Sequence, residues 1–337
     1  MKRIITWSLL ILLLAGCKDR QLSKRTVRVA FYNVENLFDT IDDPNKPDEE
    51  FTPEGRNKWT PERYDAKLGK LAQVVEGLEF PALLGLCEVE NEQVCKDLAA
   101  TKALRKQGYQ VVHHESPDYR GIDNALLYRA RDFRVLSHEA IGITFPKEIV
   151  ENYTTRDILY VRGVLHKLDT LHLFVNHWPS RRGGLEASEP KRTYVAGQLR
   201  QAVDRVFSQN ARAKVIIMGD FNDETDNRSV AEVLRAASDS SDPQPGELYN
   251  THASLDAVGV GTYNYRGNWN LLDQVIVSGG LAKATGGFEL VSSGVFKRDW
   301  MLFKHDKYGE TPNRTYGGPN YYGGYSDHLP VYIELER

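Results

Sequence analysis

The first chemically informative residue in the sequence is Glu88, a carboxylate placed in an apolar run. The stretch 81-PALLGLCEVEN-91 has the composition of a buried strand up to Cys87, and Glu90 follows two residues after Glu88. An unpaired buried carboxylate is costly, or its pKa shifts until the group is neutral. The position therefore predicts a bound cation or a basic partner.

Polar side chains follow other strand-like runs in the same way. In 27-VRVAFYNVEN-36, strand alternation places Asn33 and Glu35 on the face of Val29 and Phe31. Polar groups gathered at one end of a sheet would form a site. The remaining strand-end residues of this kind are Asn176, His177, Asp220, Asn222, Asp273, Asp327 and His328.

The elements that must position these residues are short strands with a few helices among them. Thr60 and Pro61 have the types of an N-cap and a first-turn residue, and an apolar stripe from Leu68 to Leu78 predicts a helix. Further helices are expected after Pro190 and near 229–237. This mixture predicts packed sheets with helices outside. Strand-like runs occur at 27–34, 82–89, 124–128, 159–165, 171–177, 214–220, 271–277 and 329–335.

The order of these motifs resembles the endonuclease/exonuclease/phosphatase superfamily of metal-dependent phosphodiesterases, over about residues 27–336. One such motif alone would be weak evidence of the resemblance, whereas six motifs in the family's order are strong evidence. The resemblance implies an α/β (α+β) fold, a four-layer α/β/β/α sandwich of two mainly antiparallel sheets. The markers are 33-NVEN-36, Glu88 in 86-LCEVE-90, 176-NH-177, 219-GDFN-222, 272-LDQVIV-277 and 326-SDH-328.

The resemblance implies that Glu88 is the chief ligand of a divalent ion, with Asn33, Glu35 and Asp327 near it. The ion in this family is usually Mg²⁺, and Mn²⁺ or Ca²⁺ is an alternative. The residue chemistry agrees, because hard cations prefer oxygen ligands. Mg²⁺ keeps several waters and uses one or two carboxylates plus the substrate phosphate.

The resemblance also implies catalytic roles. Asp220 would orient the attacking water, and Asn222 would bind a phosphate oxygen. Asp273 would hold His328, which would act as general base or stabilise a phosphate oxygen. His177 would face the leaving group as an acid or a hydrogen-bond donor, as in the deoxyribonuclease, sphingomyelinase and inositol-phosphatase branches. Each residue alone has an ordinary explanation, such as a turn cap, but their joint order favours a site.

Several residues near these motifs are candidates for substrate binding. Arg156 resembles the phosphate-contacting arginine of deoxyribonuclease-like members, and guanidinium forks match phosphate oxygens. For each arginine, a surface ion pair is an equally good interpretation. The candidates are Tyr119, Arg120, Arg156, Asn176 and Arg181, with Arg182 and Arg192 also near His177 in the sequence.

The segment 296–308 interleaves basic and aromatic residues. It would grip a nucleic-acid strand by charge and stacking, touch a membrane surface, or pack as an ordinary loop. Its basic residues are Lys297, Arg298, Lys304 and Lys307, and its aromatic residues include Trp300, Phe303 and Tyr308.

The N-terminus has the pattern of a bacterial lipoprotein signal. Lys2 and Arg3 precede an apolar run from Ile4 to Leu14 that is too short to span a bilayer. The sequence 14-LAGC-17 resembles a lipobox. We expect a signal peptide at 1–16, lipidation of Cys17, a tether at 17–26 and the enzyme domain at 27–337. The protein would then lie in the bacterial cell envelope, anchored in the outer membrane on its periplasmic or surface face.

Charge and cysteine content exclude other classes. Removing residues 1–16 takes the net charge from −3 to −5, which excludes a bulk polyanion binder. Cys87 and Cys95 form neither a zinc pattern nor a disulfide framework; they could pair with each other, but two free thiols are the favoured interpretation.

The leading hypothesis is a monomeric, lipid-anchored, Mg²⁺-dependent phosphodiesterase with endonuclease-like activity on DNA or RNA. One alternative is a phosphatase or phospholipase C-type enzyme acting on inositol phosphates or phospholipid headgroups. Another is a non-catalytic binding protein, against which the intact set of site residues argues.

Overall fold

The computed structural model describes residues 25–238 and 241–337. The expected signal peptide, Cys17 and the tether as far as residue 24 lie outside the described residues. Within those ranges, no helix has the length and apolar character needed to cross a membrane. Cys87 and Cys95 are both buried free thiols, as expected.

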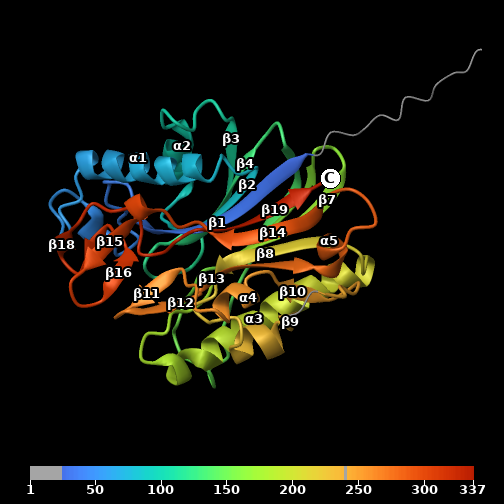
Figure 1. The fold of residues 1–337 in the computed structure, drawn as a ribbon. Helices are drawn as coiled ribbons and strands as arrows, with labels where there is room; N and C mark the ends of the chain where they lie inside the picture. The colour runs from blue at the N-terminus through green and yellow to red at the C-terminus, as the bar shows by residue number, and fades with distance from the viewer. Residues whose placement is uncertain (1–24, 239–240) are drawn as a thin grey trace, which may run out of the picture.

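Two large, mainly antiparallel sheets form the centre of the molecule (Figure 1). In spatial order, the first sheet contains β14 (Glu289–Val295), β19 (Val331–Glu336), β1 (Thr26–Leu37), β2 (Leu83–Val89), β4 (Asp123–Arg129) and β3 (Tyr109–His113). The second contains β5 (Phe133–Ile141), β6 (Ile158–Leu165), β7 (Asp169–His177), β8 (Lys214–Asp220), β13 (Asp273–Ser278), β10 (Leu248–Asn250) and β9 (Ala236–Ala237). The parallel neighbours are β1–β2, β7–β8 and β9–β10.

Helices cover the outer face of each sheet and complete four layers. Helices α1 (Pro61–Gly77) and α2 (Glu92–Ala100) pack on the first sheet, and α3 (Leu185–Gln209) packs on the second (Figure 1). A third apolar cluster, which includes Phe31, Val161 and Met218, fills the space between the sheets. The α/β/β/α prediction is confirmed.

Short elements decorate this frame. They are the helices α4 (Ala253–Asp256) and α5 (Gly279–Ala282), the 3-10 turns Glu49–Phe51 and Asp299–Met301, the π-helical turn Ser229–Val233, and the hairpins β11 (Tyr263–Tyr265) with β12 (Asn268–Asn270), β15 (Leu302–His305) with β16 (Gly309–Pro312), and β17 (Tyr316–Gly317) with β18 (Asn320–Tyr321).

The helices follow the sequence predictions in part. α1 begins after Thr60 with Pro61 in its first turn, and its expected apolar stripe is buried. The second helix does not follow Pro190 but begins at Leu185 and contains that proline. Pro190 is exposed in the second turn, where it removes one hydrogen bond without burying an unpaired group. The third helix is only the π-helical turn, followed by β9.

Candidate active site

Glu88 leaves its strand because β2 is irregular at that residue. Its φ is 61°, and the pairing of β2 with β4 passes from Cys87 to Val89 without it. By alternation Glu88 would join Leu86 beneath α1 and α2, but the bulge gives that place to Val89. Bulges often re-aim side chains beside active sites, and a left-handed non-glycine residue costs about 1–3 kcal/mol. The bulge directs the Glu88 carboxylate towards a cavity.

A second bend, in β1, separates Glu35 from the other predicted ligands. Glu35 and Asn36 have φ values of 50° and 48°, and the β1–β2 register shifts between Asn33 and Leu37. The expectation that Glu35 continues the face of Asn33 is therefore corrected. Its carboxylate instead accepts hydrogen bonds from the Thr315 and Tyr316 N–H groups at 2.6 and 3.2 Å. Glu35 lines a separate hollow of about 200 Å³.

Strand register places three site residues in one row across the second sheet. His177 of β7 pairs with Asp220 of β8, and Asp220 pairs with Asp273 of β13. The preceding residue, Asn176, points to the opposite face because strand side chains alternate. It is fully buried, donates to the carbonyls of Phe174 and Met218 at 3.2 and 3.4 Å, and does not line the cavity. The structure therefore places Asn176 behind the wall of the cavity, on the other face of β7 from His177.

Asp220 lies at the centre of this cluster. Its Oδ2 accepts a hydrogen bond from Asn33 Nδ2 at 3.0 Å, and its Oδ1 accepts one from the Asn222 N–H at 2.9 Å. His177 Nε2 and His328 Nε2 lie 3.6 and 3.8 Å from its Oδ2. Burial raises the pKa of Asp220 to about 7, and the charge of Asp273 adds to the shift although His328 opposes it.

Asp273 and His328 form a buried hydrogen-bonded pair. His328 Nδ1 lies 2.6 Å from Asp273 Oδ2, and Asp273 is completely buried. Burial lowers the pKa of His328, but the carboxylates of Asp273 and Asp220 outweigh it and hold that pKa well above its usual value. The ring of Tyr263 lies 4.9 Å from the His328 ring, between centroids. This arrangement favours a protonated imidazole whose Nε2 faces the cavity.

His177 has the opposite character. Burial lowers its pKa well below the usual value, and the guanidinium groups of Arg156 and Arg120 lower it further. Its Nε2 lies 3.9 Å from Glu88 Oε1. At neutral pH the cluster therefore holds one neutral and one protonated histidine, which can perform different tasks.

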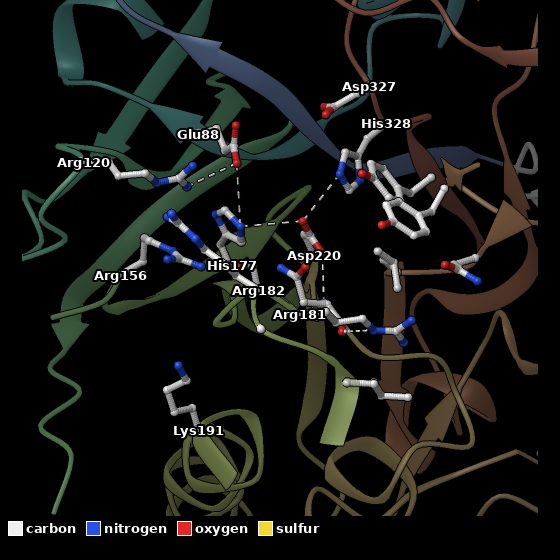
Figure 2. A pocket seen from close by; sticks show the side chains of 18 of the residues that line it. Glu88, Arg120, Arg156, His177, Arg181, Arg182, Lys191, Asp220, Asp327 and His328 are labelled. Atoms are coloured by element: carbon white, nitrogen blue, oxygen red, sulfur yellow. Dashed lines mark hydrogen bonds and ion pairs between the residues drawn. The ribbon is translucent and has the colours of Figure 1, made fainter. Parts of the chain in front are cut away.

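These side chains line one cavity of about 810 Å³ (Figure 2). Glu88, His177, Asp220, Asn222, Asp327 and His328 all line it, and Asn33 and Asp273 lie directly behind Asp220 and His328. Asp327 also contacts Arg314, at 2.8 Å. The structure thus brings together eight of the nine residues expected to have metal or catalytic roles, leaving Glu35 apart.

The predicted arginines have different surroundings. Arg120 lines the cavity 3.4 Å from Glu88 Oε1. Arg156 also lines it, but its guanidinium is held by Asp118 Oδ2 at 2.9 Å and by the Trp178 carbonyl at 2.5 Å. Arg181 donates to the Asn222 carbonyl at 2.7 Å and so supports a residue with a φ of 50°.

Arg192, Arg182 and Tyr119 are the remaining candidates for substrate binding. Arg192 is fully buried 2.7 Å from Asp223 and does not line the cavity. Tyr119, which is exposed, and Arg182 both line it.

Several lining residues were missed by sequence reasoning. Tyr263 and Tyr265 reach the cavity from the β11–β12 hairpin, and Lys191 and Tyr153 lie at its other end. The hairpin had a signal, since its two tyrosines alternate before a tight turn at 266–267, where both residues have positive φ. Lys191 had none, because nothing in the helical pattern of α3 separates it from solvated positions.

The basic and aromatic segment at 296–308 does not line the cavity. Phe296 and Met301 are buried against α1, and Lys297 contacts Glu310 at 3.2 Å. Packing describes Phe296 and Met301, whereas all four basic residues of the segment are exposed, so its nucleic-acid and membrane interpretations stay predictions.

A family model for the endonuclease/exonuclease/phosphatase family matches residues 28–337. The chain belongs to this family. It is therefore a metal-dependent hydrolase that acts on phosphate ester bonds, as predicted. A search of curated proteins found no significant match to this sequence.

Solved structures show the same family fold. D. rerio TDP2 complexed with a single-strand DNA product has a TM-score of 0.58 and 16% identity, covering 92% of this chain and 98% of that chain. A mannosyl-6-phosphatase from Bacteroides thetaiotaomicron has a TM-score of 0.56 and 16% identity, covering 92% and 99%. The human Nocturnin catalytic domain has a TM-score of 0.55 and 17% identity, covering 92% and 94%. At these identities the likeness concerns the fold.

The donor atoms of the cavity fit the divalent ion that this family uses. Glu88, Asp220 and Asp327 offer carboxylate oxygens, the ligands that hard cations prefer. Asp220, Asp273 and His328 also lie close enough together to hold an ion. In that set His328 would have to use Nε2, because its Nδ1 is hydrogen-bonded to Asp273. Glu88 lines the same cavity but does not join this group of closely spaced ligand atoms, so its role as the principal ligand stays a prediction.

Proposed function

We propose that this protein is an Mg²⁺-dependent phosphodiesterase that hydrolyses nucleic acid strands. The observation that carries the proposal is the convergence of Glu88, His177, Asp220 and the Asp273–His328 pair in one cavity. A volume of about 810 Å³ exceeds what one phosphate group fills and leaves room for the groups on either side of it.

The residues divide the work of hydrolysis by their protonation states. Protonated His328 donates from Nε2 to a nonbridging phosphate oxygen. Asp220 orients the attacking water and accepts its proton through the carboxylate that lies between His177 and His328. Neutral His177 donates a hydrogen bond on the leaving-group side, which favours the donor role over the acid role. A divalent ion held by Glu88 would supply positive charge to the phosphate oxygens, and Mn²⁺ or Ca²⁺ could replace Mg²⁺ there.

Two tyrosines that line the cavity favour a nucleic acid as the substrate. Tyr265 is 53% exposed and lines the cavity beside Tyr263. Exposed rings beside a phosphate-cleaving site suit the stacking of unpaired bases. The likeness to TDP2 bound to a single-strand DNA product adds support.

The second candidate is a phosphatase acting on a compact phosphorylated sugar or polyol. The packed segment at 296–308 favours it, because its basic residues do not extend the cavity into a wide nucleic-acid surface. The fold likeness to the mannosyl-6-phosphatase is in keeping with this alternative.

We further propose that the protein is exported and held in the cell envelope by a lipid on Cys17, as a monomer. The support is the 14-LAGC-17 motif behind a short apolar run.

The test is a substrate panel with full-length protein in detergent, with Mg²⁺ at two salt concentrations. The panel contains single-stranded DNA, RNA, supercoiled plasmid, mannose 6-phosphate, inositol phosphates and sphingomyelin. We expect cleavage of single strands, abolished by a chelator and by Asp220→Asn. Turnover of a sugar or inositol phosphate with intact nucleic acids would replace the nuclease proposal by the second candidate.

A further inference from the structure

Glu35 and Asp327 are neighbouring carboxylates to which the proposed hydrolytic step assigns no role. Asp327 lines the cavity beside His328 (Figure 2), and Glu35 lines the separate hollow. Burial, and after it the charge of Asp327, raises the pKa of Glu35 to about 7. Two like charges that repel each other in this way need a cation near both. Either a metal ion or the protein itself can supply that charge.

Arg314 supplies one positive charge to both carboxylates. Its Nη2 lies 2.8 Å from Asp327 Oδ2, and its Nε lies 3.7 Å from Glu35 Oε1. One guanidinium thus connects a carboxylate of the hollow to a carboxylate of the cavity, as its several donors allow. Solvent weakens these contacts, because the Arg314 side chain is 44% exposed. A buried cation would act on the same carboxylates more strongly.

Lys67 of α1 is such a cation, and it is only 2% exposed. Its Nζ donates to Thr315 Oγ1 at 2.7 Å and to the Tyr325 carbonyl at 2.8 Å. Burial lowers the pKa of Lys67 to about 8, and the charges of Glu35 and Asp327 oppose that shift. A lysine is almost never fully buried without an opposite charge, and these two carboxylates provide it.

The Glu35 carboxylate has little capacity left for a metal ion. Its Oε2 accepts the Thr315 N–H at 2.6 Å, and its Oε1 accepts the Tyr316 N–H at 3.2 Å and faces Arg314. Within residues 25–238 and 241–337, two groups of acidic and histidine side chains lie close enough together to hold an ion, and neither contains Glu35 or Asp327. Two carboxylates and two cations balance in formal charge, so these four side chains are compensated without a metal ion.

We propose that Arg314 and Lys67 are built-in cations that neutralise Glu35 and Asp327, so that the protein binds one divalent ion, in the catalytic cavity, and none between Glu35 and Asp327. The inference rests on the proposed function for the ion in the cavity. It replaces the ligand role that the resemblance implied for Glu35. A second ion at these carboxylates would have to displace a guanidinium that already contacts both.

Counting bound ions tests this without turnover. Mn²⁺ is the probe, because electron paramagnetic resonance measures its free concentration, and it is titrated into full-length protein in detergent without substrate. We expect the wild type to bind one Mn²⁺ per chain, and Glu35→Gln to bind one with unchanged affinity. Two ions per wild-type chain, or loss of the ion in Glu35→Gln, would overturn the proposal.

Removing a built-in cation should create a new ion site. Arg314→Gln should bind a second, weaker Mn²⁺, because Glu35 and Asp327 then lack their shared guanidinium. Adding Glu35→Gln to this variant should abolish the second ion. A count of one in Arg314→Gln, with a native circular dichroism spectrum, would overturn the role of Arg314.

Arg228→Gln is the matched control. Arg228 also lies between two carboxylates, 3.6 Å from Glu189 and 3.6 Å from Glu232, but it lines neither the cavity nor the hollow. Its removal should leave the count at one. A second ion in this variant would mean that the loss of any paired arginine raises the count, and would overturn the assignment to Arg314.

The count and the substrate panel separate this inference from the proposed function. Cleavage of nucleic acid by a protein that binds two ions refutes the built-in cations alone. One ion per chain without cleavage of nucleic acid refutes the proposed function alone.

Discussion

Replacing Asp273 by Asn removes the charge that holds His328 and leaves a side chain of the same size. The bond between the two is 2.6 Å long and Asp273 is completely buried, so solvent cannot replace the lost partner. A hydrogen bond to a charged group contributes about 1.5–3 kcal/mol. If that energy acts on the transition state, kcat should fall about 10- to 100-fold, because 1.36 kcal/mol is tenfold in rate.

The pH dependence gives the sharper signature of Asp273→Asn. In the wild type the carboxylates hold the pKa of His328 well above its usual value against the effect of burial. Without Asp273 the burial effect remains and that pKa must fall. His328 then loses its proton at lower pH, so the alkaline limb of the kcat profile should move to lower pH while KM stays similar.

The assay is steady-state hydrolysis of thymidine 5′-(p-nitrophenyl phosphate) between pH 5 and 10, with thermal unfolding measured alongside. Asp169→Asn is the control, because Asp169 is also ion-paired, to Lys214 at 2.8 Å, but lies at the opposite end of β7 from His177. The control should keep the wild-type profile. An unmoved alkaline limb in Asp273→Asn, or a rise in KM as large as the fall in kcat, would refute the assigned role of the pair.

Four further outcomes follow from the structure and the proposals. Glu88→Gln should fold normally yet lose most activity, and excess Mg²⁺ should restore it only in part; full wild-type activity of the native enzyme in a strong chelator would contradict the metal assignment. Tyr265→Ala should weaken single-strand DNA binding by about 1–3 kcal/mol per stacked base in fluorescence anisotropy, whereas Tyr265→Phe should not; equal losses in the two variants would exclude stacking. Burial lowers the pKa of His252 to about 4, so the contribution of the neutral ring to the free energy of unfolding should be full above pH 6.5 and fall by up to about 3 kcal/mol towards pH 4. Denaturant unfolding should therefore depend less on pH in His252→Gln, and an unchanged pH dependence would argue against this linkage. Cys17→Ser should shift the protein out of the detergent phase or leave an uncleaved precursor, and unchanged partitioning would count against lipidation.

The resemblance to the family implied the four layers and the roles of the site residues, whereas the periodic patterns predicted packed sheets with helices outside and polar groups at the strand ends. Strand alternation and the register of neighbouring strands suffice to align His177, Asp220 and Asp273. The same alternation failed at Glu35, because two consecutive left-handed residues in β1 break the period. A bend of this kind depends on contacts such as those of Glu35 with the Thr315 N–H, 280 residues away in the chain.

The prediction that Asn176 binds substrate came from the family motif, and strand alternation argues against it. The family motif paired it with His177, and consecutive residues of a regular strand point to opposite faces. The place of Lys191 in the cavity wall could not be predicted from the sequence, since Lys191 meets Tyr153 only through the packing of two separate segments. Loop-to-helix contacts of this type leave no periodic trace in the sequence.

The central position of β1 has a consequence for how an anchored enzyme would face its surroundings. Thr26 pairs with Glu336, next to the C-terminus, whereas Asn33 touches Asp220 beside the cavity. The seven steps between them span roughly 23 Å at about 3.3 Å per residue. A lipid on Cys17 would therefore attach to the domain at the end of β1 remote from the cavity, so the anchor itself would not obstruct a substrate that enters it.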